Sequence, residues 1–169
     1  VDRVELTFEL DPESTRVTST LSLRRNHDAG AEDTLTLFGD SLTLDALMLN
    51  GVPLAPTAFR SEASRIVIDA HVLTAAGDQA TLTIITRFNP SANLALEGLY
   101  VTSGTFCTQC EAEGFRRITY FPDRPDVLSE YFVTIRADKT RFPVLLSNGN
   151  LLGARELDGG RHEARWHDP

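Results

Sequence analysis

The chain has 169 residues, of which 41% are hydrophobic and 24% are charged. This composition is typical of an ordinary globular domain and excludes collagen-like and disordered chains. No apolar run approaches the roughly 20 residues of a membrane-spanning helix, and no signal peptide is visible at the start. Because the chain begins with Val1 rather than Met, it stays open whether an export signal has been removed.

The charge balance excludes further classes of partner. Sixteen Lys and Arg residues against 24 Asp and Glu residues give a net charge of −8. The basic residues form no cluster, whereas nucleic acids and anionic membranes bind to a localised positive field. We therefore expect neither nucleic acid nor membrane as a partner. The two cysteines, Cys107 and Cys110, are too few for a secreted disulfide scaffold, which favours a reducing compartment and a cytoplasmic location.

Alternation of apolar and polar residues with period two dominates the first ninety residues. It predicts a β-hairpin of residues 4–10 and 17–23 around a turn at 11–14. Further runs rich in Thr, Val and Ile predict strands at residues 34–37, 42–49, 66–72 and 82–88. Glycine-containing turns, each expected between strands, occur at residues 50–51, 148–149 and 158–160.

Helix patterns are weak throughout, and no internal repeat or long linker divides the chain. We therefore predict a single all-β domain over residues 1–169, an antiparallel β-sandwich of about a dozen short strands. The strand-like residues 161–166 run almost to Pro169, which we interpret as the boundary of a domain in a longer protein.

Residues 96–126 depart from the simple alternation and are dense in polar, glycine and aromatic residues. Gln109, Glu111 and Glu113 alternate with Cys110 and Ala112, which on a strand would place the first three on one face. One interpretation is an ordinary solvated strand face. The other is a carboxylate cluster that receives a cation, since a carboxylate and an ammonium form a short charge-assisted hydrogen bond.

Two sequence patterns suggest metal or redox chemistry but are incomplete. Cys107 and Cys110 have C-x-x-C spacing, yet a lone pair supplies only two of four zinc ligands, and no βαβ setting supports a redox motif. We expect buried or half-buried structural thiols. His162 and His167 are five residues apart on a predicted strand, so they point to opposite faces and cannot share a metal. The residues thus predict neither a metal site nor a catalytic residue in this segment.

Three segments together resemble the N-terminal domain of the bacterial aminopeptidase N family. They are N-L-A-L-E-G-L-Y at 93–100, C-T-Q-C-E-A-E-G-F-R at 107–116 and I-T-Y-F-P-D-R-P-D at 118–126. The resemblance continues in looser form through 137–139 and 145–150 to Trp166, and it includes the first hairpin. It covers nearly the whole chain, and residues 93–126 are its most diagnostic part.

The resemblance implies a saddle-like, mostly antiparallel β domain that leans on a thermolysin-like catalytic domain outside this chain. That domain carries the G-A-M-E-N motif and the zinc-binding H-E-x-x-H helix of an alanyl-type zinc aminopeptidase. This segment is then expected to bind no zinc and to be inactive alone. Its Gln-x-Glu element matches Gln109 and Glu111, and the implied role of Glu111 is to bind the free α-ammonium of a peptide substrate. Gln109 would contact the first substrate residue or its amine.

The same resemblance gives supporting roles to neighbouring residues. Glu113 is expected to make supporting hydrogen bonds, while Arg116, Asp123 and Arg124 are expected to fix the local loop. Two other functions remain as alternatives. One is a stand-alone β-sandwich module that binds a protein or glycan through the face from Gln109 to Glu113, and the other is a small metal or redox protein built on the cysteine pair.

Overall fold

The structure is a computed structural model that describes residues 1–26 and 34–169. In these residues it contains 13 strands, one α-helix and three short 3-10 helices. The strands are β1 (Arg3–Glu9), β2 (Thr15–Arg24), β3 (Leu35–Phe38), β4 (Thr43–Leu49), β5 (Val52–Pro53), β6 (Phe59–Glu62), β7 (Arg65–Ile68), β8 (Gln79–Phe88), β9 (Gly98–Thr102), β10 (Thr105–Gln109), β11 (Glu130–Asp138), β12 (Asn150–Leu157) and β13 (Arg161–Asp168). The helices are α1 (Ala70–Ala76), η1 (Pro90–Ala92), η2 (Gly114–Arg117) and η3 (Asp158–Gly160).

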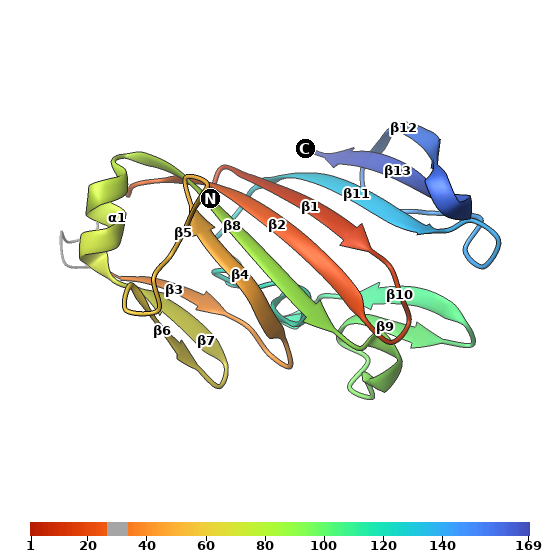
Figure 1. Ribbon diagram of the computed structural model, residues 1–169, viewed down its shortest axis with the longest axis horizontal. Coiled ribbons are helices and arrows are strands. Elements are labelled where there is room, and N and C mark those ends of the chain that lie inside the picture. The colour runs from red at the N-terminus through yellow and green to blue at the C-terminus, as the bar shows by residue number, and fades with distance from the viewer. Residues whose placement is uncertain (27–33) are drawn as a thin grey trace.

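One large sheet forms the body of the molecule (Figure 1). It has eight strands in the order β12-β13-β11-β1-β2-β8-β4-β5. The sheet β3-β7-β6 and the hairpin β9-β10 lie on one side of it (Figure 1). Neighbours in the large sheet are antiparallel except β1 and β11, which pair in parallel from Arg3 opposite Glu130 to Glu9 opposite Arg136. The predicted all-β sandwich of about a dozen strands is confirmed.

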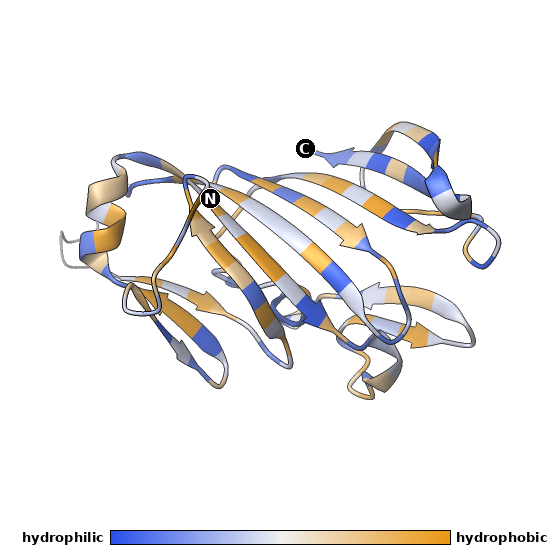
Figure 2. Ribbon diagram, viewed as in Figure 1, coloured by the Kyte–Doolittle hydropathy of each residue, from blue (hydrophilic) through white to orange (hydrophobic). Residues whose placement is uncertain are grey.

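The core lies between the large sheet and the two small ones. Val4, Leu6 and Phe8 of β1 are buried, and so are the residues opposite them, such as Leu21 and Val17 of β2. Strands of the large sheet alternate hydrophobic and hydrophilic residues along their length (Figure 2). Burying one face of such a strand removes its apolar side chains from water, which stabilises the fold by roughly 25 cal/mol per Å² of apolar surface buried.

The structure corrects the strand predicted at residues 66–72. Strand β7 ends at Ile68, and Ala70–Ala76 form the helix α1, which ends at Gly77 with a positive φ of 87°. Alanine is the strongest helix former, and three alanines in seven residues outweigh the β preference of Val72. The helix lies at one end of the molecule (Figure 1) and buries none of its residues completely.

Two of the three predicted glycine turns join strands. Asn50 and Gly51, with φ of 51° and 78°, connect β4 to β5, and Asp158–Gly160 connect β12 to β13. Asn148 and Gly149 do precede β12, but residues 142–147 in front of them belong to no strand. The prediction of strands on both sides of this turn was therefore wrong.

A network of ion pairs crosses four strands at one end of the large sheet. Arg136 of β11 contacts Glu163 of β13 at 2.6 Å and Glu9 of β1 at 2.9 Å. Arg155 of β12 also contacts Glu163, at 3.0 Å, and Arg161 contacts Glu9 at 2.6 Å. The Glu163 side chain is 2% exposed. Burial raises the pKa of Glu163, but hydrogen bonds from Arg155 and Arg136 outweigh this effect and leave its pKa below the usual value.

Replacing the buried carboxylate, Glu163→Gln, is expected to lower the free energy of unfolding by about 1–3 kcal/mol at pH 7, because it removes the charged partner of Arg155 and leaves Arg136 paired with Glu9 alone. Because the pKa of Glu163 is lower in the folded than in the unfolded chain, its charge stabilises the fold at pH values above the unfolded-state pKa. This contribution is lost as the pH falls through the folded-state pKa. The gap between wild type and variant in urea titrations should therefore shrink below about pH 4. Glu62→Gln, which breaks the exposed pair with Arg65, is the control and should cost less than about 0.5 kcal/mol.

Candidate functional site

The segment with the predicted site begins in the hairpin β9-β10. Gln109 is the last residue of β10 and pairs with Gly98 of β9. A turn of residues 111–113 follows, with a cis peptide bond between Glu111 and Ala112, and it leads into η2. The side chain of Gln109 folds over this turn, because its Nε2 donates a hydrogen bond to the carbonyl oxygen of Glu111 at 3.2 Å.

The prediction that Gln109, Glu111 and Glu113 share one strand face was wrong. The strand ends at Gln109, so period-two alternation no longer governs where the two glutamates point. Glu113 flanks the start of η2, and its carboxylate lies 3.1 Å from the Arg116 guanidinium. The supporting role expected for Glu113 fits this contact.

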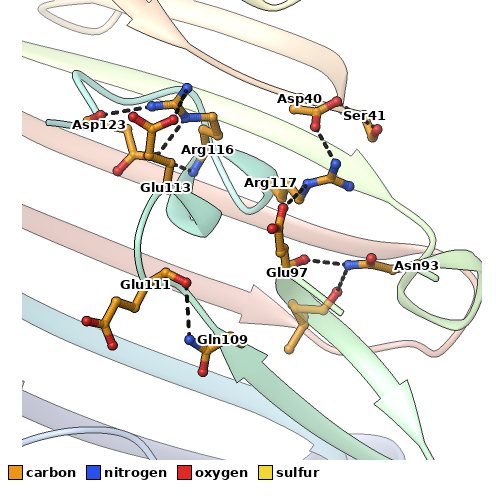
Figure 3. Close-up of polar contacts among 11 residues, drawn as sticks. Asp40, Ser41, Asn93, Glu97, Gln109, Glu111, Glu113, Arg116, Arg117 and Asp123 are labelled. Atoms are coloured by element: carbon orange, nitrogen blue, oxygen red, sulfur yellow. Dashed lines mark hydrogen bonds and ion pairs between the residues drawn. The ribbon is translucent and has the colours of Figure 1, made fainter. Parts of the chain in front are cut away.

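Glu111 differs from Glu113 in having an unpaired carboxylate. Glu111 is exposed, and no hydrogen bond or ion pair from the described residues reaches its side-chain oxygens. Figure 3 shows its side chain extending away from Glu113 and Arg116. A carboxylate that is held on a short turn without an intramolecular partner is available to a cation from outside.

Close backbone packing fixes this turn. The N–H of Gly114 donates to the carbonyl oxygen of Cys110 at 2.8 Å. A Cβ at position 114 would lie 2.4 Å from the Gln109 carbonyl oxygen and 3.0 Å from the Gly98 nitrogen, so only glycine fits here. The backbone on both sides of Glu111 is therefore pressed against the β9-β10 hairpin.

Two arginines of η2 attach the segment to its surroundings. The Nε of Arg116 donates to the Asp123 carboxylate at 3.0 Å, and its Nη2 donates to the Asp123 carbonyl oxygen at 3.0 Å. This contact confirms that Arg116 and Asp123 fix the local loop. Arg117 contacts Asp40 at 2.6 Å and Glu97 at 3.4 Å (Figure 3). Arg117 was missed in the sequence, since nothing there indicated that the loop before β4 would reach it.

The cysteines behave as structural thiols. Both are free and half-buried, as predicted. Burial, followed by the negative charge of Asp123, raises the pKa of Cys110 to about 11. The thiolate is the form that binds metals and attacks disulfides, and Cys110 is almost entirely protonated at neutral pH.

The two histidines of β13 point apart. His162 Nε2 lies 2.7 Å from the Phe142 carbonyl oxygen, whereas His167 Nε2 lies 2.7 Å from the Glu130 carboxylate. The two rings thus have different partners, in line with the prediction that they point to opposite faces of the strand. Across residues 1–26 and 34–169, no three His, Cys, Asp or Glu side chains are grouped so that they could hold a metal ion. None of the helices described here has the length and apolar character to cross a membrane.

Comparison with known proteins identifies the family of the chain. The Peptidase M1 N-terminal domain family matches residues 2–169. Aminopeptidase N of Caulobacter vibrioides is 49% identical over 169 residues, which are 100% of this chain and 19% of that protein. Aminopeptidase N of Escherichia coli is 45% identical over 167 residues, or 98% of this chain and 18% of that protein. The chain thus spans about a fifth of the length of these relatives.

Solved structures show the same fold. Aminopeptidase A of Legionella pneumophila, solved with aspartic acid, superposes with a TM-score of 0.88 at 31% identity, covering 99% of this chain and 19% of that chain. The M1 zinc metallopeptidase of Deinococcus radiodurans has a TM-score of 0.73 at 14% identity, covering 99% of this chain and 38% of that chain, which supports the fold alone. Because the family match spans almost every residue, the chain belongs to the Peptidase M1 N-terminal domain family.

Proposed function

We propose that this chain is the N-terminal, substrate-anchoring domain of a zinc aminopeptidase, and that Glu111 binds the α-ammonium of the peptide substrate. The observation that carries the proposal is the exposed, unpaired carboxylate of Glu111 on a turn whose backbone is fixed by Gly114. Its neighbour Glu113 has the same charge but is occupied by Arg116. The side chain of Gln109 folds over the same turn, and its proposed role is to contact the first substrate residue or its amine.

A carboxylate at this position accounts for a preference for chain ends. The free terminus of a peptide is an ammonium that forms a charge-assisted hydrogen bond with the carboxylate. An internal peptide bond presents a neutral amide instead, and binding it would desolvate the carboxylate without a compensating charge. A fixed Glu111 would therefore select an exopeptidase substrate before any bond is broken.

The metal and hydrolytic groups of the proposed enzyme would lie in the rest of the protein. The described residues of this chain do not fit a zinc site, since they hold no group of three ligands. The domain alone is therefore expected to release no amino acid from a peptide. Its contribution is to bind and orient the amine end of the substrate.

The proposed role can be tested in the full-length protein with Glu111→Gln, which keeps the size of the side chain and removes its charge. We expect a higher KM and a fall in kcat/KM of more than about tenfold on an aminoacyl anilide, equivalent to about 1.4 kcal/mol. A des-amino analogue of the same substrate supplies the charge-specific readout. The wild type should prefer the aminoacyl compound strongly, and the variant should lose most of this preference.

Glu113→Gln is the matched control on the same turn. Because Glu113 is paired with Arg116, this variant should change kcat/KM by less than about threefold and keep the preference for a free amine. Equal kinetic constants for Glu111→Gln and the wild type would refute the role of Glu111.

Gly114→Ala tests whether the position of the turn matters. The added Cβ would meet the Gln109 carbonyl oxygen at 2.4 Å, so the turn must shift. We expect KM for the aminoacyl anilide to rise about tenfold or more, with a loss of roughly 1–3 kcal/mol in the free energy of unfolding. Gly104→Ala in the β9-β10 turn is the control for backbone strain alone, because nothing lies within 4 Å of the added Cβ. This variant should lose some stability, since φ at position 104 is positive, but its KM should stay close to that of the wild type. If the two variants have the same KM, the close packing at Gly114 does not position the site.

A further inference from the structure

Arg117 of η2 joins two segments that are distant from it in the sequence (Figure 3). Its Nη2 lies 2.6 Å from the carboxylate of Asp40, in the loop between β3 and β4. Its Nε lies 3.4 Å from the carboxylate of Glu97, directly before β9. The Arg117 side chain is 23% exposed, so most of it lies between these segments rather than in water. Because its partners among the described residues are Asp40 and Glu97, Arg117 does not neutralise Glu111.

The two carboxylates belong to segments whose main chain is itself held in place. The N–H of Asp40 donates to the carbonyl oxygen of Arg116 at 2.9 Å. The Nδ2 of Asn93 donates to the carbonyl oxygen of Glu97 at 2.6 Å. The planar guanidinium has donors on more than one side, which lets Arg117 bind both carboxylates at once. It therefore connects η2 to two fixed points.

The stem of Arg117 packs on the strand that pairs with β10. A Cβ at Gly98 would lie 2.6 Å from the Arg117 Cβ, so the two residues can approach this closely only because position 98 is glycine. Gly98 is also the strand partner of Gln109, the last residue before the turn that carries Glu111. The other end of this turn is Gly114, where η2 begins. Arg117 thus attaches the helix at one end of the turn to the strand beside the other end.

We propose that Arg117 is a positioning residue for the amine site: by binding Asp40 and Glu97 it fixes the spacing between β10 and η2, and with it the place of Glu111. This inference rests on the proposed function of Glu111 and adds a residue that touches no substrate. No described residue pairs with the Glu111 carboxylate, so the two ends of its turn determine where it lies. A displacement of about 1 Å can lower a rate by roughly a hundredfold, so a small change in this spacing is sufficient.

A positioning role differs in its effects from that of an ordinary surface ion pair. The side chains of Asp40 and Glu97 are 42% and 55% exposed, and ion pairs with such exposed carboxylates contribute little to the free energy of unfolding. Loss of the Arg117 guanidinium should therefore change the recognition of the substrate amine much more than the stability of the fold.

The proposal is tested in the full-length protein with Arg117→Met, which keeps an unbranched apolar stem and removes the guanidinium. On the aminoacyl anilide we expect KM to rise about fivefold or more while kcat changes by less than about twofold. The preference for this substrate over its des-amino analogue should fall by about fivefold or more, and the urea midpoint should stay close to that of the wild type. Arg87→Met is the matched control, because it breaks the ion pair of Arg87 with Asp45 between β8 and β4. It should leave both KM and the preference within about twofold of the wild type.

The double variant Arg117→Met/Glu111→Gln shows whether Arg117 acts through Glu111. Both single changes weaken the same contact with the amine, so adding Arg117→Met to Glu111→Gln should lower the preference by less than about twofold. A larger further fall would overturn the positioning role, because Arg117 would then act elsewhere. A smaller rise in KM for Arg117→Met than about fivefold, or a fall in kcat as large as the rise in KM, would also overturn it. If Glu111→Gln alone leaves the preference unchanged, the proposed function is refuted and the positioning role with it.

Two further variants give the answer if Arg117→Met fails to fold. Asp40→Asn and Glu97→Gln each remove one charged partner and leave Arg117 in place. At least one of them should raise KM by about twofold or more with kcat unchanged, because η2 loses one of its two attachments. Unchanged KM in both variants would contradict the proposal.

Discussion

The close approach of Gly114 to the β9-β10 hairpin is the constraint on which the proposed site depends. No Cβ fits between this residue and the Gln109 carbonyl oxygen. Because glycine has none, the chain can leave β10, turn through Glu111 and return against the same hairpin. The hydrogen bond from Gly114 to Cys110 closes the turn, and Arg116 then attaches it to Asp123. A carboxylate on such a turn is held in place by backbone packing rather than by contacts of its own.

This arrangement gives two neighbouring glutamates different chemistry. Glu113 forms an ion pair with Arg116, whereas the exposed carboxylate of Glu111 is available to a partner from outside. In binding sites generally, a preorganised and unpaired charge loses less free energy on binding, because no internal ion pair must first be broken. The difference arises because the backbone turns between Glu111 and Glu113. It could not be predicted from the side-chain type that the two residues share.

The strands were predictable where one face of a sheet is buried. Val4, Leu6 and Phe8 show the required alternation and are buried as expected. The end of β10 was not predictable in this way, because Gln109, Glu111 and Glu113 alternate in sequence just as a strand would, while Gly114 draws the backbone into a turn. The helix α1 was missed because Val72 follows the apolar run of β7 after only three residues and was taken as part of the same strand.

The alternation of Gln109, Glu111 and Glu113 offered a cation-binding cluster as one of two interpretations, and the resemblance of residues 93–126 to a family then gave Gln109 and Glu111 their expected roles. What the structure adds is the exposure of Glu111 and the pairing of Glu113. Which of two neighbouring apolar side chains is buried lay beyond sequence reasoning. Leu145 and Leu146 look equivalent as letters, but one packs on Ala164 and the other faces solvent, and only the tertiary arrangement separates them.

The parallel pairing of β1 with β11 has a consequence for how the domain is made. The two strands are separated by more than one hundred residues, yet they lie side by side at the centre of the large sheet. During synthesis β1 can pair with β2 at once, but its other edge stays open until β11 leaves the ribosome. An open edge beside buried residues is a template for pairing with other chains, so the nascent protein passes through a stage in which it is vulnerable to aggregation.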